Sequence, residues 1–276
     1  MIHAQIVKDE PAVYFGREAL SQSGMTQLLR CPAHFRAMLD RAGEPEEQTD
    51  ALLAGSLLHC MVLEPGALHA RYAIRQNAGN TKAGKEEAAQ AEASGVRLVK
   101  ADMWDVCERM AESVREHPLM RAALAEPDFA AESSVYWTEL DGRVPCKARI
   151  DALASLPGFG LCAIDLKTTR DASPAALEKS IHAFSYHRQA AWYMRGLRAA
   201  GCGVRAFIFL FVEKEPPFLT VAASISEAAQ QVALDEIKTC VHTYADCIES
   251  GIWPGYTESP VIELDLPAWA YRRKDA

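Results

Sequence analysis

The sequence of 276 residues has no long hydrophobic run, no excess of basic residues and no closely spaced cysteines. No stretch approaches the roughly 18 uninterrupted apolar residues that a membrane-spanning helix requires, which argues against a membrane protein. The first ten residues lack a basic start followed by an apolar core, so no secretion signal is expected. Hydrophobic residues make up 49% and charged residues 24%, values typical of a globular protein rather than a disordered or collagen-like chain.

The eight cysteines are scattered through apolar segments instead of forming pairs at short spacing. Such a distribution is typical of buried free thiols in a reducing compartment. We therefore expect a cytoplasmic protein without structural disulfides.

The net charge of −8 results from 29 basic and 37 acidic residues and argues against a protein that coats nucleic acid by bulk electrostatics. A local basic channel is still compatible with it. The stretch 179–205 has no acidic residue and carries five basic ones, namely Lys179, Arg188, Arg195, Arg198 and Arg205. This pattern suits an enzyme that grips phosphates in a groove, and a solvated helix face explains it equally well.

The N-terminal half has helical periodicity, with predicted helices over 25–39, 51–64 and 100–125. Ser23 or Thr26 is the expected cap of the first helix, and Pro32 is expected to kink or divide it. Asp50 is the expected cap of the second. Residues 75–95 are polar and weakly amphipathic, so we expect a mobile, partly helical excursion there.

The pattern changes to strands after residue 132. Strands are predicted over 133–140, 143–154 and 161–168, then a helix over 185–199, strands over 204–212 and 218–225, and a helix from 226 to 251. The turn signal Asp141-Gly142 joins the first two strands as a hairpin. The order predicts a single α/β domain over 1–276, with a helical elaboration (20–130), a core (131–250) and a C-terminal tail (251–276).

Two acids and a lysine lie on neighbouring predicted strands. Side chains alternate between the two faces of a strand, so Asp165 and Lys167 share a face while Leu166 points into apolar packing. The same alternation places Lys147, Arg149 and Asp151 on one face of the preceding strand. If the two strands pair across the turn at 156–160, the carboxylates of Asp151 and Asp165 converge at one end of the hairpin.

Buried carboxylates without a compensating partner cost free energy of folding. A hard divalent cation such as Mg²⁺ would offset this cost, because it prefers carboxylate oxygens as ligands. The lysine could then hold or deprotonate a metal-bound water, or stabilise charge on a phosphate. The alternative is a surface Asp–Lys pair on an edge strand. The upstream Asp151 and the apolar residues around Asp165 and Lys167 favour the metal site.

Four further side chains are weaker candidates when taken alone. Gln189 and Tyr193 are spaced to share a helix face. His59 follows Gly55 by one helical turn and could reach a metal, although a lone helical histidine is more often structural. Glu132 immediately precedes a predicted strand and could equally be a surface carboxylate.

Together these residues resemble the PD-(D/E)xK nuclease superfamily. The resemblance is carried by the segments Gly55-Ser-Leu-Leu-His59, Glu132, Ile150-Asp151, Ile164-Asp165-Leu-Lys167-Thr-Thr and Gln189-Ala-Ala-Trp-Tyr193. More narrowly, the chain resembles the exonuclease domain of RecE-type exodeoxyribonucleases (exodeoxyribonuclease eight) over residues 20 to 270.

The resemblance implies a restriction-endonuclease-like α/β core and a 5′-to-3′ exonuclease. Such an enzyme degrades one strand of linear double-stranded DNA and leaves 3′ single-stranded tails for strand annealing. It implies Mg²⁺ as the cofactor, with Mn²⁺ able to substitute, held by His59, Asp151, Asp165 and the carbonyl of Leu166. It also gives the remaining residues their roles: Lys167 assists the nucleophilic water, Glu132 lies in or next to the metal shell, and Gln189 and Tyr193 position the scissile phosphate or the end of the strand. Apart from the resemblance, Arg188 of the basic stretch and Arg149 are further candidates for contact with the phosphate.

The expected partners are linear DNA, a single-strand annealing protein of the RecT type and further copies of the chain in a ring, in a phage or prophage setting within a bacterial cell. No membrane association is expected. We expect no iron–sulfur cluster, because Cys240 and Cys247 lack the tight spacing that would have to accompany Cys31. An endonuclease with the same site and a non-catalytic DNA-binding scaffold are the alternatives. Intact Asp151, Asp165 and Lys167 speak against the scaffold.

Overall fold

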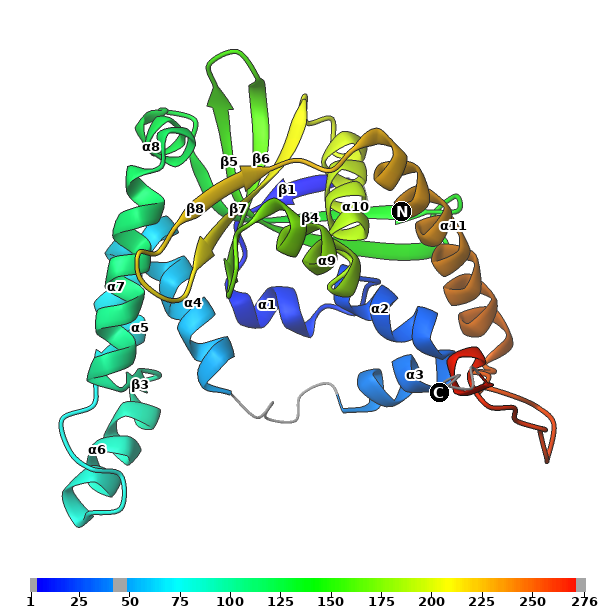
Figure 1. The fold of residues 1–276 in the computed structure, drawn as a ribbon, viewed down its shortest axis with the longest axis horizontal. Coiled ribbons are helices and arrows are strands. Elements are labelled where there is room, and N and C mark those ends of the chain that lie inside the picture. The colour runs from blue at the N-terminus through cyan, green and yellow to red at the C-terminus, as the bar shows by residue number, and fades with distance from the viewer. Residues whose placement is uncertain (1–3, 42–48, 272–276) are drawn as a thin grey trace, which may run out of the picture.

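The computed structural model describes residues 4–41 and 49–271 and has three layers, a central β-sheet between two groups of helices (Figure 1). The sheet has the strand order β1-β4-β5-β6-β7-β8. Its strands are β1 (Gln5–Val7), β4 (Ala130–Glu139), β5 (Val144–Leu156), β6 (Gly160–Thr169), β7 (Ala206–Glu213) and β8 (Thr220–Ala223). Neighbouring strands are antiparallel except β6 and β7, which are parallel. The predicted mixed sheet flanked by helices is confirmed.

The sheet buries apolar side chains on both faces. Strand β7 is an almost uninterrupted apolar run, as expected for a strand covered on both sides. Its Phe209 packs into the core on one face, and its Leu210 packs into the core on the other. The two cores hold the helical layers against the sheet.

The helices divide between these two faces. One core contains residues of α2 (Gln22–Arg30), α3 (Pro32–Asp40), α9 (Pro174–Ala183), α10 (Tyr186–Ala199) and α11 (Glu227–Ser250). The other contains residues of α4 (Asp50–Leu63), α7 (Ala101–Glu116) and α8 (Pro118–Ala125). Helices α9 and α10 form the crossover between the parallel strands β6 and β7.

Helix α10 lies unusually close to the sheet. A Cβ atom at Gly196 would approach the Trp137 ring to 2.5 Å, so only glycine fits there without movement. The Trp137 and Trp192 rings pack with centroids 4.6 Å apart, and the Trp192 indole donates a hydrogen bond to the Lys147 carbonyl at 3.1 Å. This packing fixes the rotation of α10 and directs Gln189 toward β6.

Most predicted elements are present, but the caps predicted for the first two helices were wrong. Pro32 divides the first predicted helix into α2 and α3. Ser21 caps α2, because its Oγ accepts a hydrogen bond from the Gly24 amide at 3.2 Å. Thr49 caps α4 in the same way through the Leu52 amide at 3.3 Å. In both cases a hydroxyl residue lies just before the predicted cap.

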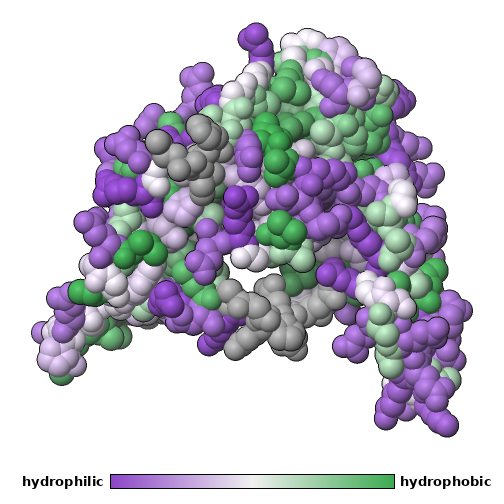
Figure 2. Space-filling view, turned by 180° about the vertical axis from the view of Figure 1, so that it is seen from behind, coloured by the Kyte–Doolittle hydropathy of each residue, from purple (hydrophilic) through white to green (hydrophobic). Residues whose placement is uncertain are grey.

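Several short elements were not predicted. They are β1, α1 (Pro11–Gly16), α5 (Leu68–Arg71), α9 and the parallel pair β2 (Tyr72–Ile74) and β3 (Arg97–Val99). The polar segment 75–95 contains α6 (Lys82–Ala93), which projects from the body on the opposite side from the C-terminal segment (Figure 1). Seen from behind, most of the surface is hydrophilic, and hydrophobic side chains form separate patches (Figure 2).

The C-terminal segment begins after α11, which ends at Gly251 in a left-handed conformation. Trp253 stacks on Phe35 with ring centroids 5.6 Å apart, and residues 251–267 have no regular secondary structure. The short 3₁₀ helices are Pro65–Ala67 and Ala268–Tyr271. All eight cysteines are free, and every one except the half-buried Cys202 is buried.

No single helix of the described residues is long and apolar enough to span a membrane. Helix α4 and the helical turns over Pro65–Arg71 reach that length only as a pair bent by 118°.

Candidate active site

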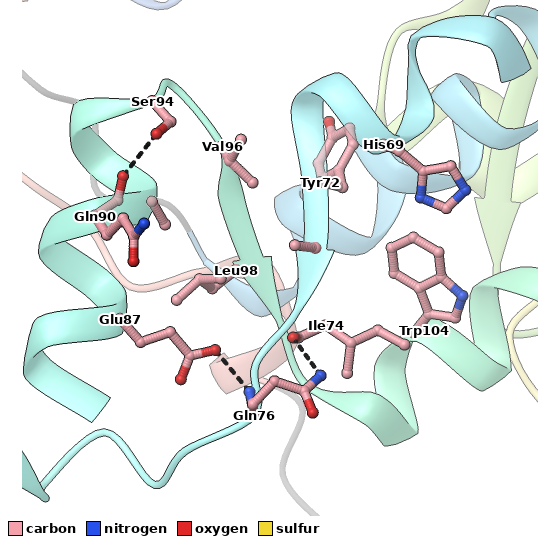
Figure 3. A pocket seen from close by; sticks show the side chains of 12 residues that line it. His69, Tyr72, Ile74, Gln76, Glu87, Gln90, Ser94, Val96, Leu98 and Trp104 are labelled. Carbon is pink, nitrogen blue, oxygen red and sulfur yellow. Dashed lines mark hydrogen bonds between the residues drawn. The ribbon is translucent and has the colours of Figure 1, made fainter. Parts of the chain in front are cut away.

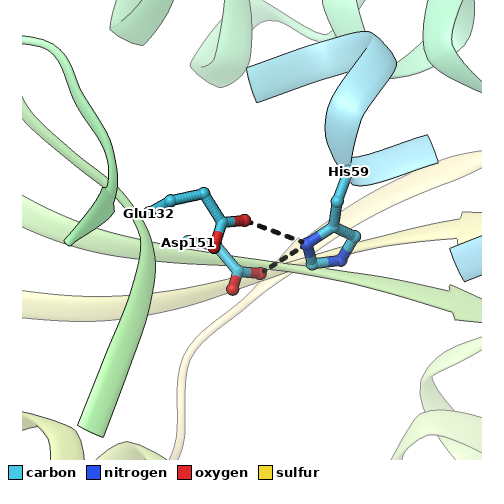
Figure 4. A group of neighbouring side chains, drawn as sticks. All are labelled: His59, Glu132 and Asp151. Atoms are coloured by element: carbon cyan, nitrogen blue, oxygen red, sulfur yellow. Dashed lines mark ion pairs between the residues drawn. The ribbon is translucent and has the colours of Figure 1, made fainter. Parts of the chain in front are cut away.

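Three potential metal ligands converge beside the middle of the sheet (Figure 4). One ligand atom each from His59, Glu132 and Asp151 lies within 4.8 Å of the other two. His59 Nδ1 is 3.8 Å from Glu132 Oε1 and 3.6 Å from Asp151 Oδ2. All three side chains are largely but not fully buried, so the cluster is open to a ligand from solvent.

Irregular backbone brings the two acids together. Glu132 of β4 stands opposite Asp151 of β5, between the regular pairs Ala131↔Ala152 and Ser133↔Ile150. Glu132 has a φ of +54°, a conformation that non-glycine residues adopt at a cost. Side-chain alternation along β5 also breaks here, because Ile150 and Ala152 lie in opposite cores.

His59 comes from α4, which covers one face of the sheet. Its Nε2 contacts the Leu166 carbonyl oxygen at 2.9 Å. When Nε2 donates this hydrogen bond, the neutral imidazole presents the lone pair of Nδ1 to the two carboxylates, as a metal ligand would. A Cβ atom at Gly55 would meet no atom within 4 Å, so the described chain makes no close approach to that glycine.

The backbone of Leu166 is held at both its N–H and its carbonyl. Its N–H donates to Asp151 Oδ2 at 2.8 Å, while its carbonyl faces His59. The Leu166 side chain is buried on the α4 face, as predicted from the alternation along β6. The backbone of Leu166 therefore links β6 to Asp151 and His59.

Asp165 and Lys167 form an ion pair of 2.6 Å between Oδ2 and Nζ. Asp165 is almost fully buried, and its Oδ1 accepts a hydrogen bond from Gln189 Nε2 at 2.6 Å. The predicted set Asp151, Asp165, Lys167 and Gln189 thus meets at one place. In this arrangement the Asp165 carboxylate faces Lys167 and Gln189, and Glu132 is the acid grouped with His59 and Asp151.

The protonation of the cluster follows from burial and mutual charge. Burial alone would lower the pKa of His59, but Asp151 and Glu132 outweigh it and raise that pKa to about 9. Burial and the nearby Asp165 charge raise the pKa of Asp151 to about 7. Burial opposes the charged form of Lys167, yet Asp165 and Asp151 raise its pKa, so the lysine is a cation.

Glu132 is held by the guanidinium group of Arg149. Arg149 Nε donates to its Oε2 at 2.6 Å, and another guanidinium nitrogen of Arg149 donates to the Asp9 carbonyl at 3.2 Å. Burial would raise the pKa of Glu132, but His59 and Arg149 outweigh this and lower it. Arg149, a candidate for phosphate contact, is thus engaged with Glu132.

The chemistry of this donor set fits a divalent cation. Two carboxylates and an imidazole nitrogen are ligands for Mg²⁺-like and Mn²⁺-like ions, and a cation would replace the proton that otherwise compensates the acids. His59, Glu132 and Asp151 would hold it, with Asp165 and the Leu166 carbonyl adjacent.

Tyr193 is half-buried one turn beyond Gln189 and packs edge-on against Phe207, with ring centroids 5.8 Å apart. Burial raises the pKa of Tyr193 well above its usual range, with the charges of Asp165 and Asp151 acting in the same direction. It is therefore a neutral hydroxyl on the site side of α10.

Arg188, a further candidate for phosphate contact, is bonded to residues inside the protein. It is buried, and its guanidinium donates to Glu236 Oε2 at 2.6 Å and to Thr26 Oγ1 at 3.0 Å. These bonds join α10 to α11 and α2. The basic stretch is in part a set of structural ion pairs, since Arg195 is also paired, with Glu139.

Sequence reasoning missed one residue of the site. The Tyr186 ring lies 5.4 Å from Lys167 Nζ in a cation–π arrangement. It precedes Gln189 by three residues, a spacing that places both on one helix face. That spacing was the available signal.

A separate groove of about 540 Å³ lies between α6, the β2–β3 pair and α7 (Figure 3). It is lined by apolar residues such as Ile74, Leu98 and Trp104 and by the acid Glu87. The Glu87 carboxylate accepts hydrogen bonds from the Gln76 and Asn77 amides at 2.7 and 2.8 Å. It holds a loop, and none of the lining residues belongs to the acid cluster.

The mixed sheet, its flanking helices and the Asp-x-Lys strand beside further acids define a PD-(D/E)xK nuclease fold. Residues 21–262 match the sequence profile of a family described as a PDDEXK-like domain of unknown function. The chain belongs to this family.

Comparison with solved structures supports the same fold. The chain is similar to the crystal structure of a protein from Eubacterium rectale that is provisionally described as an exonuclease. The TM-score is 0.61 at 14% sequence identity, over 97% of this chain and 98% of that one. A second structure, of SSO0001, covers 68% of this chain and 86% of its own at 16% identity, and its TM-score of 0.29 carries no argument. No curated protein matches the chain.

Proposed function

We propose that this protein is a metal-dependent exonuclease that degrades one strand of linear double-stranded DNA in the 5′-to-3′ direction. The observation that carries the proposal is the convergence of His59, Glu132 and Asp151 beside the Asp165–Lys167 pair. A metal-dependent nuclease requires these groups together, whereas a non-catalytic DNA-binding scaffold does not require them.

The side chains have distinct parts in the proposed reaction. A bound divalent cation supplies an electrophile for a phosphoryl oxygen and lowers the pKa of a coordinated water. His59, Glu132 and Asp151 hold this cation. Lys167 lies next to this site, paired with Asp165, and would assist the attacking water or stabilise charge on the phosphate. Gln189 keeps Asp165 oriented.

The exonuclease subtype is supported by the sequence resemblance to RecE-type enzymes and by the description of the E. rectale protein. From that resemblance we propose Mg²⁺ as the cofactor, 3′ single-stranded tails as the product, a RecT-type annealing protein as partner and a ring of several copies. A bacterial cytoplasm and a phage or prophage origin belong to the same proposal.

The test is digestion of linear and closed-circular duplex DNA with Mg²⁺, with a label at either the 5′ or the 3′ end of each linear strand. Chelation by EDTA and the variant Lys167→Ala are the controls. We expect loss of linear DNA only, with the 5′ label released first and no digestion in either control.

Other outcomes discriminate the alternatives. Nicking of the circle would make the protein an endonuclease. Release of the 3′ label first would reverse the polarity. Binding of DNA without digestion in Mg²⁺ or Mn²⁺ would make it a scaffold on a nuclease fold.

A further inference from the structure

Phe184 is an exposed aromatic residue at the junction of α9 and α10. Only Phe184 and Ser185 separate the two helices, and 62% of the Phe184 surface is accessible. Single exposed hydrophobic residues are common and need no explanation by themselves. Two further observations distinguish this one.

The backbone at this junction is held in place. The Phe184 amide donates to the Ser180 carbonyl at 2.9 Å, and the Ser185 amide donates to the His182 carbonyl at 3.2 Å. Ser185 has a φ of +55°, a left-handed conformation that is unfavourable for residues other than glycine. Strained backbone of this kind concentrates at functional sites, and here it fixes the direction in which Phe184 leaves the surface.

The Phe184 ring is the outer end of an aromatic stack that leads to the active site. It stacks on Tyr186, with ring centroids 5.5 Å apart and planes at 29°. Tyr186 in turn lies over the ammonium of Lys167 at 5.4 Å and packs on Phe209 at 5.2 Å. The Phe184 ring is therefore at most about 11 Å from the Lys167 ammonium.

We propose that Phe184 stacks on a nucleobase of the DNA strand being cleaved, one or two nucleotides from the scissile phosphate. The inference rests on the proposed nuclease function and adds a positioning residue to it. Its distance from Lys167 suits a base whose neighbouring phosphate lies at the metal ligands. Stacking on an aromatic ring tolerates any base, as an enzyme that digests DNA of any sequence requires.

The test compares wild type with Phe184→Ala, Phe184→Leu and Phe184→Trp on linear duplex DNA. Phe159→Ala is the matched control, because Phe159 has a similar exposure of 59% but lies at the tip of the β5–β6 hairpin. Each protein is assayed on intact DNA and on a series with one abasic site at successive positions from the cleaved end. Thermal unfolding is measured for every variant, and only a small change is expected because most of the ring surface is exposed.

We expect Phe184→Ala and Phe184→Leu to raise KM about 5- to 150-fold on intact DNA with a smaller change in kcat, which is the range of base–aromatic stacking. Phe184→Trp and Phe159→Ala should behave as wild type. At one abasic position, wild type and Phe184→Ala should have equal KM, because the base that Phe184 contacts is missing.

The two hypotheses fail in different ways. The stacking inference is wrong, and the nuclease proposal stands, if wild type digests DNA but Phe184→Ala has the KM of wild type on intact DNA. The same conclusion holds if the KM of Phe184→Ala exceeds that of wild type by the same factor at every abasic position. If wild type digests no DNA with Mg²⁺ or Mn²⁺, the nuclease proposal is wrong and the stacking role falls with it.

Discussion

The carboxylate of Asp151 accepts a hydrogen bond from the backbone amide of Leu166 at 2.8 Å. This bond links the acid of β5 to the peptide that separates Asp165 from Lys167 on β6. His59 contacts the carbonyl of the same residue, so the backbone of Leu166 binds two candidate functional side chains. Changes at this place should therefore separate effects on metal binding from effects on folding.

Asp151→Asn should abolish cleavage and stabilise the metal-free protein. Burial and Asp165 raise the pKa of Asp151 from 3.8 to about 7, so ionisation of this group opposes folding. The penalty in the wild type grows from about pH 4 to pH 7 and is constant above. The variant should thus gain about 1 kcal/mol or more in free energy of unfolding at pH 8, and less at pH 5.

Urea unfolding in EDTA at the two pH values measures this gain, and the digestion assay measures the activity. Equal gains at pH 5 and pH 8, or cleavage at the wild-type rate, would contradict the assignment of Asp151.

Metal binding should release a proton at pH 7.5. The pKa of His59 is raised to about 9, so its imidazole is protonated in the metal-free protein, whereas a metal ligand must be neutral. The affinity for Mg²⁺ or Mn²⁺ should accordingly fall as the pH drops below about 9. Calorimetric titration with Mn²⁺ in two buffers of different ionisation enthalpy counts the protons. Buffer-independent heats would show that His59 does not lose a proton to the metal.

The faces of β6 could be predicted from sequence because the strand is regular. Ile164 and Leu166 are buried in one core, and Asp165 faces α10 on the other side. The hairpin and both ends of α11 were predicted for a similar reason, since Asp141-Gly142, Ser226 and Gly251 each have a local conformational role.

The position of Glu132 could not be predicted in the same way. Its positive φ and its place opposite Asp151 depend on the pairing of β4 with β5, and no periodic pattern encodes a break in alternation. Strands β1, β2 and β3 have three residues each, too few for periodicity to be detected. The ion pair of Arg188 could not be predicted from sequence, because its partner Glu236 lies 48 positions away.

Arg188→Ala should lower stability instead of weakening DNA binding specifically. Removal of the guanidinium leaves Glu236 with only the longer contact to His187 at 3.4 Å, which we expect to cost about 2–3 kcal/mol. Arg198→Ala is the matched control: Arg198 is on the same helix, is exposed and has no ion pair among the described residues, so it should change stability by less than about 0.5 kcal/mol.

Denaturant unfolding of both variants, with the salt dependence of DNA binding measured at a temperature where both are folded, separates the two roles. A stable Arg188→Ala protein with a smaller salt slope would restore the phosphate contact.

Glu132→Gly should be more stable than Glu132→Ala, although glycine is normally the worse residue in a strand. Both substitutions remove the carboxylate and its bond to Arg149, so both should lose metal-dependent cleavage. They differ in the φ of +54°, which glycine adopts freely and alanine does not, and we expect a difference of about 0.5–1 kcal/mol in free energy of unfolding in favour of glycine.

At Ser134, a buried position of the same strand outside the left-handed region, the order should be reversed, because glycine there only adds entropy to the unfolded chain. Urea unfolding of the four variants tests this. A glycine variant less stable than the alanine variant at both positions would mean that Glu132 does not hold the left-handed conformation, and that the two acids are brought together by side-chain rotation alone.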